Sequence, residues 1–136
     1  MKKVVCFVSL TRNYRYICNA QGEQRMKQIR LIMTDEAFNF VESLSQKVGD
    51  KIHYNINRIK DGEVNNEIFK KLENTDIWEF RTLYNKTAYR LFAFWDTEGE
   101  TLIIATHGIV KKTQKTPSKE IAQAERRRAN YFKNKQ

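Results

Sequence analysis

The sequence has few cysteines, one proline and no long apolar segment. The sequence has two cysteines, Cys6 and Cys18, and no third cysteine or nearby histidine at metal-ligand spacing. A structural zinc site is therefore not expected. We interpret both as buried, reduced thiols of a cytosolic protein. The chain also contains no internal repeat and no low-complexity stretch, which excludes repeat and fibrous architectures.

No segment approaches the length of apolar chain that spans a bilayer. The opening Met-Lys-Lys and the apolar residues 4–8 look superficially like the start of a secretory signal, but the apolar run is too short. No small-residue cleavage site follows it. We therefore predict a cytoplasmic protein without a membrane partner.

The net charge of +9 at pH 7 is distributed unevenly. Residues 1–33 carry +6, residues 34–106 carry −4 and residues 107–136 carry +7. A basic C-terminal quarter beside a balanced middle is typical of a protein that binds a polyanion, most often nucleic acid, and it suits an acidic protein partner equally well. A solvated basic tail without a partner gives the same pattern.

The length of 136 residues predicts a single domain over residues 1–136. A chain of this size buries roughly two thirds of its unfolded surface, which is enough for one core without disulfides or metals. We assign residues 26–136 to the core. Residues 1–25 form an N-terminal β-like extension, in which the runs 3–10 and 14–18 are expected to pair as a hairpin.

Two helices are predicted in the first half of the core. After a strand over residues 26–33, Thr34 is a good N-cap, and apolar residues then recur at helical spacing as far as Gly49. Asp50 caps a second helix, which ends at residues 61–62. The two helices are expected to form a helical hairpin packed on the sheet.

Three antiparallel strands follow, and alternating or continuous apolar residues predict them. They are residues 77–81, 88–95 and 102–105. Turns are expected at 84–87 and 96–100, and the chain is expected to leave the sheet at 106–108. The stretch 66–72, before the first of these strands, is interpreted as one or two helical turns.

Thr116 as N-cap and Pro117 at the first helical position predict a C-terminal helix. Its apolar stripe is thin, since several of its apolar residues are alanines, and residues 126–128 are all arginine. The order of one strand, two helices, three strands and one helix predicts an α+β fold. Its antiparallel sheet has about four strands, packed against the helical hairpin, with a basic helix at the C-terminus.

Several basic side chains are expected to converge near one surface of this sheet. Within residues 77–81, Arg81 shares a face with Glu79, and Arg90 is the one charge of an otherwise apolar central strand. The last strand leads to a cluster of lysines. The converging residues are Arg81, Arg90, His107, Lys111, Lys112 and Lys115.

These segments resemble a known family. The strings I-W-E-F-R at 77–81, Y-R-L-F-A-F-W at 89–95 and H-G-I-V-K-K-T-Q-K-T-P from residue 107 are similar to the RelE/ParE superfamily of toxin–antitoxin toxins. Within it, the chain most resembles the phage-derived HigB-like branch. The resemblance is sharp over residues 77–129, follows the order of elements over 26–74, and is absent from the first 25 residues.

The resemblance implies a RelE-like fold and the toxin of a type II toxin–antitoxin system. The implied activity is ribosome-dependent cleavage of messenger RNA, in which the ribose 2′-hydroxyl attacks the adjacent phosphate without a metal or other cofactor. A cognate antitoxin and messenger RNA on the ribosome are the implied partners. We expect an acidic or amphipathic antitoxin segment to cover the basic surface.

Arg90 matches the strand arginine of the family and is the best candidate to clamp the scissile phosphate, because a guanidinium binds in a bidentate way and keeps its charge. Arg81 on the adjoining strand is expected to assist. The alternative for Arg90 is an ion pair with Glu79 or Asp96 at the rim of the sheet.

Lys111, Lys112 and Lys115 match the basic loop of the family. Crowding by like charges lowers a lysine pKa toward neutrality, which lets Lys112 or Lys115 transfer a proton while its neighbours stay charged. The simpler interpretation is that all three bind phosphate or ribosomal RNA. His107 titrates in a useful range and is either catalytic or structural.

The remaining candidates each have a structural alternative. Tyr84 either stacks on an RNA base or covers an edge of the core. Glu79 is either a base or part of an ion pair, and His53 is interpreted as a surface residue. Several superfamily members use a late tyrosine as acid or base, and this sequence has none soon after its lysines, which leaves the acid and the base open.

Three other functions remain open. A ParE-like member of the superfamily inhibits DNA gyrase by binding and has no active site. A basic module binds RNA or the ribosome without cleaving it. A decayed phage protein folds and is inactive. The arginines and the lysine cluster favour the ribonuclease.

Overall fold

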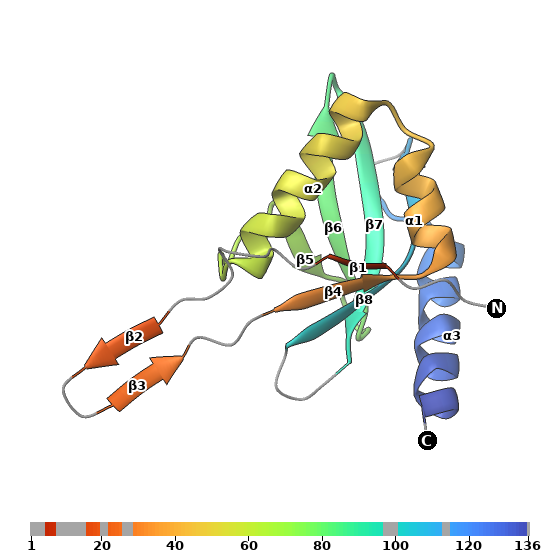
Figure 1. Cartoon of the computed structure of the whole chain (residues 1–136). Coiled ribbons are helices and arrows are strands. Elements are labelled where there is room, and N and C mark those ends of the chain that lie inside the picture. The colour runs from red at the N-terminus through yellow and green to blue at the C-terminus, as the bar shows by residue number, and fades with distance from the viewer. Residues whose placement is uncertain are drawn as a thin grey trace.

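Six strands form one mixed sheet in the order β1-β4-β8-β7-β6-β5, and β2 pairs with β3 (Figure 1). The computed structural model describes residues 5–7, 16–19, 22–25, 29–96, 101–112 and 115–135. In chain order the elements are β1 (Val5–Phe7), β2 (Tyr16–Asn19), β3 (Gly22–Arg25), β4 (Arg30–Met33), α1 (Asp35–Glu42), α2 (Gln46–Lys60), β5 (Phe69–Lys71), β6 (Trp78–Tyr84), β7 (Thr87–Trp95), β8 (Leu102–Lys111) and α3 (Ser118–Lys135). The predicted α+β class is confirmed.

The predicted order of elements is confirmed for β4, α1, α2, β6, β7, β8 and α3. The prediction of an antiparallel sheet of about four strands is wrong, because β4 pairs with β8 in parallel and because β1 and β5 extend the sheet. Residues 66–72, which were interpreted as helical turns, contain β5. A three-residue strand is too short to show its period in the sequence.

The pairing of the predicted N-terminal hairpin is also wrong. β1 lies within the run 3–10, but it pairs with β4, where Val5 is opposite Met33. β2 pairs with β3 instead, so that Tyr16 is opposite Arg25. The rest of the predicted extension lies outside the described residues.

The break between α1 and α2 lies earlier than Gly49 and Asp50, where it was predicted. Ser45 caps α2, and its hydroxyl accepts a hydrogen bond from the amide of Val48 at 3.4 Å. Gly49 is buried inside α2, where a Cβ would contact Val41 of α1 at 3.9 Å. The sequence alone does not distinguish a glycine that ends a helix from a glycine that lets two helices pack closely.

The tight turn between β6 and β7, predicted at residues 84–87, is confirmed. Asn85 and Lys86 both have positive φ angles, of 48° and 65°. Such angles match the two-residue hairpin turns that follow the twist of a sheet. The second predicted turn includes residues 97–100, which lie outside the described part of the chain.

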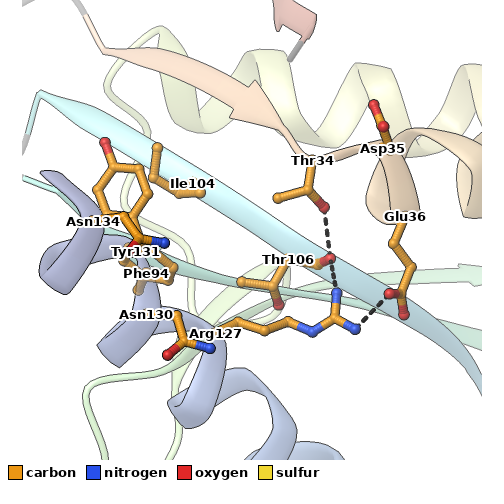
Figure 2. A pocket seen from close by; sticks show the side chains of 10 residues that line it. All are labelled: Thr34, Asp35, Glu36, Phe94, Ile104, Thr106, Arg127, Asn130, Tyr131 and Asn134. Carbon is orange, nitrogen blue, oxygen red and sulfur yellow. Dashed lines mark hydrogen bonds and ion pairs between the residues drawn. The ribbon is translucent and has the colours of Figure 1, made fainter. Parts of the chain in front are cut away.

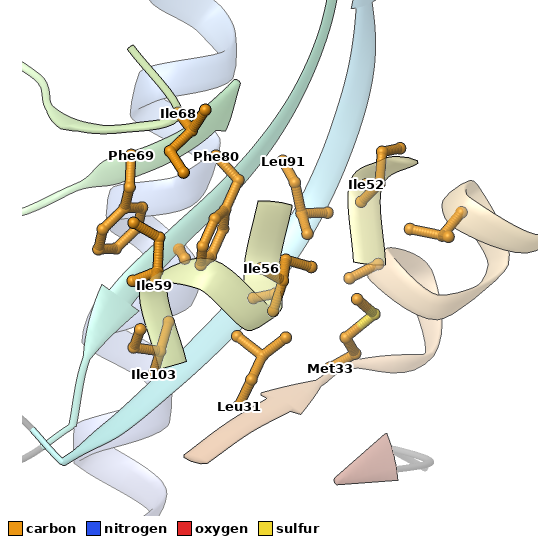
Figure 3. Packing of buried hydrophobic residues seen from close by; sticks show 14 of the residues in the cluster. Leu31, Met33, Ile52, Ile56, Ile59, Ile68, Phe69, Phe80, Leu91 and Ile103 are labelled. Carbon is orange, nitrogen blue, oxygen red and sulfur yellow. The ribbon is translucent and has the colours of Figure 1, made fainter. Parts of the chain in front are cut away.

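α1 and α2 cover one face of the sheet, which we call the two-helix face, and α3 packs on the opposite, one-helix face (Figure 1). The larger hydrophobic cluster fills the two-helix face and includes Leu31, Ile56 and Phe80 (Figure 3). The smaller cluster, on the one-helix face, contains Phe92 and Phe94. The sheet is therefore covered on both faces, although unequally.

β8 continues through the break that was predicted at residues 106–108. A β-bulge lies there, with Thr106 as the extra residue of β8 between the partners of Phe92 and Ala93. The Thr106 carbonyl accepts a hydrogen bond at 2.8 Å from the hydroxyl of Thr34, the N-cap of α1. The bulge thus fixes the start of α1 as well as the path of β8.

α3 begins near Pro117, as predicted, and amides of its first turn bond to the Pro117 carbonyl. The prediction of Thr116 as its N-cap is wrong, because the Thr116 hydroxyl donates to Glu79 of β6 at 3.2 Å. The predicted thin apolar stripe is confirmed by Ala124, the buried residue of this helix in the described chain. Two aromatic residues near its C-terminal end contact Phe94.

Candidate anion-binding site

Two arginines lie opposite each other on neighbouring strands of the one-helix face. Arg81 of β6 is the register partner of Arg90 of β7. Because strand side chains alternate, they share this face with Ile77 and Phe92. We call Arg81 and Arg90 the arginine pair. Directly opposed like charges destabilise a sheet, so a counter-charge is expected beside them.

Glu79 supplies that counter-charge. Its Oε1 lies 3.3 Å from Nε of Arg90 and 3.5 Å from Nε of Arg81. Its Oε2 accepts the hydroxyl of Thr116 at 3.2 Å. The ion pair that was the alternative for Arg90 is therefore present, whereas Asp96, its other possible partner, pairs with α3.

Two backbone carbonyls share the guanidiniums with Glu79. Nη1 of Arg81 donates to the Asn66 carbonyl at 3.4 Å, and Nη1 of Arg90 donates to the Tyr89 carbonyl at 3.2 Å. The Nε atoms of Arg81 and Arg90 are buried and have no hydrogen-bond partner among the described residues, although both lie within ion-pair distance of Glu79. The side chain of Arg90 is 9% exposed and that of Arg81 is 31% exposed. Burial lowers the pKa of Arg90 and Glu79 raises it, but a guanidinium stays charged. The excess positive charge of two arginines beside one carboxylate, together with the partly exposed side chain of Arg81, suits a bound anion.

Lys111 and Lys70 add two cations. Lys111 was predicted in a loop but ends β8, and burial and then Arg90 lower its pKa. Lys70 of β5 is exposed and is the register partner of Glu79. Sequence reasoning missed Lys70, because helical turns at residues 66–72 give it no register with β6. We call Lys70, Lys111, the arginine pair and Glu79 the cation cluster.

Lys112 and Lys115 lie on the segment between β8 and α3 and are both exposed. Lys115 directly precedes Thr116, whose hydroxyl binds Glu79. This contact brings the segment to the arginine pair. Of the residues predicted to converge, Arg81, Arg90 and Lys111 lie close together, whereas the approach of Lys112 and Lys115 to them stays a prediction.

A hollow of about 560 Å³ is lined by residues of α2, β6 and β7 and includes both arginines of the pair. Its lining residues are Lys51, Asn55, Arg58, Glu67, Ile68, Arg81, Thr82, Leu83, Ala88 and Arg90. The buried Asn55 donates to the Thr82 hydroxyl at 3.2 Å, and Lys51 donates to the Leu83 carbonyl at 2.7 Å. Cationic side chains thus continue from the sheet onto α2, a feature that the sequence pattern of α2 did not reveal.

His107 is enclosed away from this hollow. Its Nδ1 lies 3.0 Å from the Thr106 hydroxyl, its Nε2 lies 3.1 Å from Oε1 of Glu120, and its ring packs on Phe92. Burial lowers its pKa, while the hydrogen bond to Glu120 raises it. Because both ring nitrogens have partners inside the protein, the geometry favours the structural interpretation of His107.

Tyr84 and His53 also lie apart from the cation cluster. Tyr84 is partly buried and packs against the core of the two-helix face. This position agrees with the interpretation that Tyr84 covers an edge of the core. His53, interpreted as a surface residue, is half-buried on α2, where burial lowers its pKa and Asp50 raises it. Neither side chain is positioned to contact a ligand of the arginine pair.

A second hollow, of about 470 Å³, opens between α1, β8 and α3 (Figure 2). Arg127 of α3 crosses it, donating to the Thr106 carbonyl at 3.3 Å and pairing with Glu36 of α1 at 2.5 Å. Thr34 donates to the same carbonyl. These polar groups bind one another. We therefore interpret this hollow as a structural contact between α1, β8 and α3 and not as a ligand site.

The cation cluster offers positive charge, N–H donors and, at Lys111, a lysine of lowered pKa. Within the described ranges, no group of three or more histidine, cysteine, aspartate or glutamate side chains could hold a metal ion. No helix in the same ranges is long and apolar enough to cross a membrane.

Comparison with protein families gives a match over residues 39–129, which contain the whole cation cluster. The family is described as phage-derived protein Gp49-like (DUF891). It is a RelE-like, toxin-like family, consistent with a toxin of a toxin–antitoxin system. A comparison with curated proteins found no match. Since the family match spans more than half of the chain, the protein belongs to the phage-derived Gp49-like family.

Proposed function

We propose that the protein is the toxin of a type II toxin–antitoxin system, has a RelE-like fold of the HigB-like branch, and cleaves messenger RNA on the ribosome. The observation that carries this proposal is the arginine pair, two opposed guanidiniums that share one carboxylate, with the side chain of Arg81 partly exposed. The net charge of +9 supports an RNA substrate, because cations bind the phosphate backbone.

In the proposed reaction, the ribose 2′-oxygen attacks the neighbouring phosphorus. The new O–P bond forms as the 2′-hydroxyl loses its proton to solvent water, and the bond from phosphorus to the 5′-oxygen breaks as that oxygen gains a proton from Lys111. The products are a 2′,3′-cyclic phosphate and a 5′-hydroxyl, so the atoms balance without a further reactant. The intermediate carries more negative charge than the substrate, and fixed cations stabilise it.

The residues divide these tasks by their exposure and charge. Arg81 and Arg90 hold the non-bridging phosphate oxygens, and Arg81 is the more accessible of the two. Lys111 donates a proton to the leaving 5′-oxygen, since burial and Arg90 lower its pKa. Lys112 and Lys115 bind neighbouring phosphates.

Induced expression in a bacterial host, with mapping of the 5′ ends of cellular messenger RNA, tests the proposal. The wild-type protein should arrest growth and produce new 5′ ends that are phased with codons. Arg81→Ala and Arg90→Ala should lose both effects. Arg30→Ala is the matched control, since Arg30 is an exposed arginine at the start of β4, and it should cleave like wild type.

Other results would support the competing functions. Growth arrest without new 5′ ends would contradict the ribonuclease and favour a ParE-like gyrase inhibitor or a basic module that binds RNA or the ribosome. Folded wild-type protein that causes no arrest would indicate an inactive phage-derived protein.

The partner of such a toxin is a cognate antitoxin, and we propose that its acidic or amphipathic segment covers the cation cluster. Lys111 and Lys112 should then be protected from an amine-reactive reagent in the complex. Lys133, an exposed lysine of α3, serves as the unprotected control. A complex in which Lys111 and Lys112 react as they do in the free protein would contradict neutralisation by steric cover.

A further inference from the structure

Thr116 links the segment that precedes α3 to the arginine pair. Its side chain is almost fully buried, and its hydroxyl donates to Oε2 of Glu79, which is 37 residues away in sequence. The hydroxyl does not cap α3, because the first turn of that helix bonds to the Pro117 carbonyl. The contact with Glu79 is therefore the role that the structure gives to this hydroxyl.

The two oxygens of Glu79 have different partners. Oε1 faces Nε of Arg90 at 3.3 Å and Nε of Arg81 at 3.5 Å, whereas Oε2 is bound to Thr116. A carboxylate that is free to turn commonly presents both oxygens to one guanidinium in a bidentate pair. Here one oxygen of Glu79 lies within ion-pair distance of both arginines and the side chain of Arg81 stays 31% exposed, so Glu79 neutralises the arginines without covering them.

We propose that Thr116 is a positioning residue that acts through Glu79 to keep the arginine pair available to a phosphate. With the hydroxyl in place, Glu79 supplies counter-charge through one oxygen, and the exposed part of the Arg81 side chain stays open to the ligand. Without the hydroxyl, Glu79 turns its second oxygen toward Arg90 and competes with the phosphate. This inference rests on the proposed function, since it takes RNA phosphate as the ligand.

The first test measures the affinity for a short single-stranded RNA with 2′-O-methyl riboses, which binds but lacks the attacking hydroxyl. Thr116→Val keeps the side-chain shape and removes the hydroxyl. It should weaken binding by roughly two- to tenfold, the range expected for one hydrogen bond. Thr116→Ser keeps the hydroxyl and should bind like wild type. Equal affinities for Thr116→Val and wild type would overturn the inference.

A double-mutant cycle tests whether Thr116 acts through Glu79. In the Glu79→Gln background the competing negative charge is absent, so adding Thr116→Val should change the affinity no further. If Thr116 merely held the lysine segment in place, Thr116→Val would weaken binding equally in both backgrounds. That result would overturn the inference.

Two controls separate this effect from a loss of stability. Thr75→Val removes a hydroxyl that donates to the Leu72 carbonyl at 2.9 Å, and it should leave RNA affinity unchanged.

The second control is the salt dependence of binding. The slope of log affinity against log salt counts the phosphates neutralised, so it should become shallower in Thr116→Val. This measurement serves even if Glu79→Gln does not fold. An unchanged slope with unchanged affinity would refute the role of Thr116.

Because the probe cannot be cleaved, the two proposals fail separately. Wild-type protein that binds the probe and cleaves no cellular RNA would refute the nuclease, while the Thr116 comparison would still be measured. Wild-type protein that does not bind the probe would overturn the inference about Thr116 directly.

Discussion

His107 and Glu120 join β8 to the first turn of α3 inside the protein, at an Nε2 to Oε1 distance of 3.1 Å. Burial lowers the pKa of His107, and Glu120 raises it only in part. The folded protein therefore keeps the imidazole neutral at a pH where the unfolded chain, with a pKa of 6.5, has gained a proton. Since the unfolded state then binds more protons, the free energy of unfolding falls as the pH falls through that value.

We expect His107→Gln to reduce this dependence. Between about pH 7 and about pH 5.5, one such histidine contributes a slope of at most about 1.4 kcal/mol per pH unit. The variant should be less stable than wild type near neutral pH and show a shallower slope, in urea unfolding measured over this range. His53, whose pKa burial also lowers, accounts for part of the remaining slope. Equal slopes in His107→Gln and wild type would contradict the assignment.

Lys86 holds a left-handed backbone, with φ of 65°, in the turn between β6 and β7. A side chain beyond Cβ contributes nothing to this conformation, and glycine adopts it without steric conflict. Lys86→Gly should therefore raise the free energy of unfolding by about 0.5–1 kcal/mol, which is the left-handed penalty of about 1–2 kcal/mol less the larger backbone entropy that glycine loses on folding. Lys86→Ala keeps the Cβ and should give no comparable gain, which urea unfolding of both variants would check.

The arginine pair could be predicted from local sequence, but its surroundings could not. Alternation fixes the face of Arg81, and a two-residue turn at Asn85 and Lys86 sets the register that brings it opposite Arg90. The contact of Thr116 with Glu79 depends instead on how the chain returns across the sheet after β8. A threonine before a proline looks the same in sequence whether it caps a helix or binds a distant carboxylate.

Among the elements, α1 lies directly on β8 at Gly108. A Cβ at this position would overlap the ring of Phe40, so Gly108 is required by close approach rather than by its backbone angles. Gly108→Ala should lower the free energy of unfolding by about 1–3 kcal/mol, the range for overpacking a core contact. In the Phe40→Ala background the same substitution should have little further effect. An equal loss in both backgrounds would show that the ring is not the obstacle.

Long elements could be predicted from sequence because their patterns repeat several times. β7 and β8 are nine and ten residues long and contain alternating or continuous apolar residues, and the predicted strands at 88–95 and 102–105 lie within them. β5 offers only Phe69 and two lysines, and its pairing with Phe80 of β6 comes from tertiary packing. The parallel pairing of β4 with β8 could not be predicted for another reason. The sequence of a four-residue strand does not indicate whether the strand pairs in parallel or antiparallel.

For the molecule as a whole, both hydrophobic clusters are assembled from described residues between Ile29 and Phe132. Removing residues 1–25 deletes β1, β2 and β3 and takes away the partner strand of β4, but leaves the cluster residues between Ile29 and Phe132 in the chain. We expect residues 26–136 to unfold in one cooperative urea transition, at a lower urea concentration than the full chain. A shortened chain without a cooperative transition would refute the assignment of residues 1–25 as an extension.

The parallel pairing of β4 with β8 also affects the order in which contacts form during folding. It joins Arg30 to Leu102, so the strand that α1 covers is completed only when β8 is made. Contacts this distant in sequence close large loops and form late in folding. Lys111 and Thr116 belong to the same late segment. A nascent chain therefore lacks a complete cation cluster, and the contact of Thr116 with Glu79, until β8 and the segment after it have been synthesised.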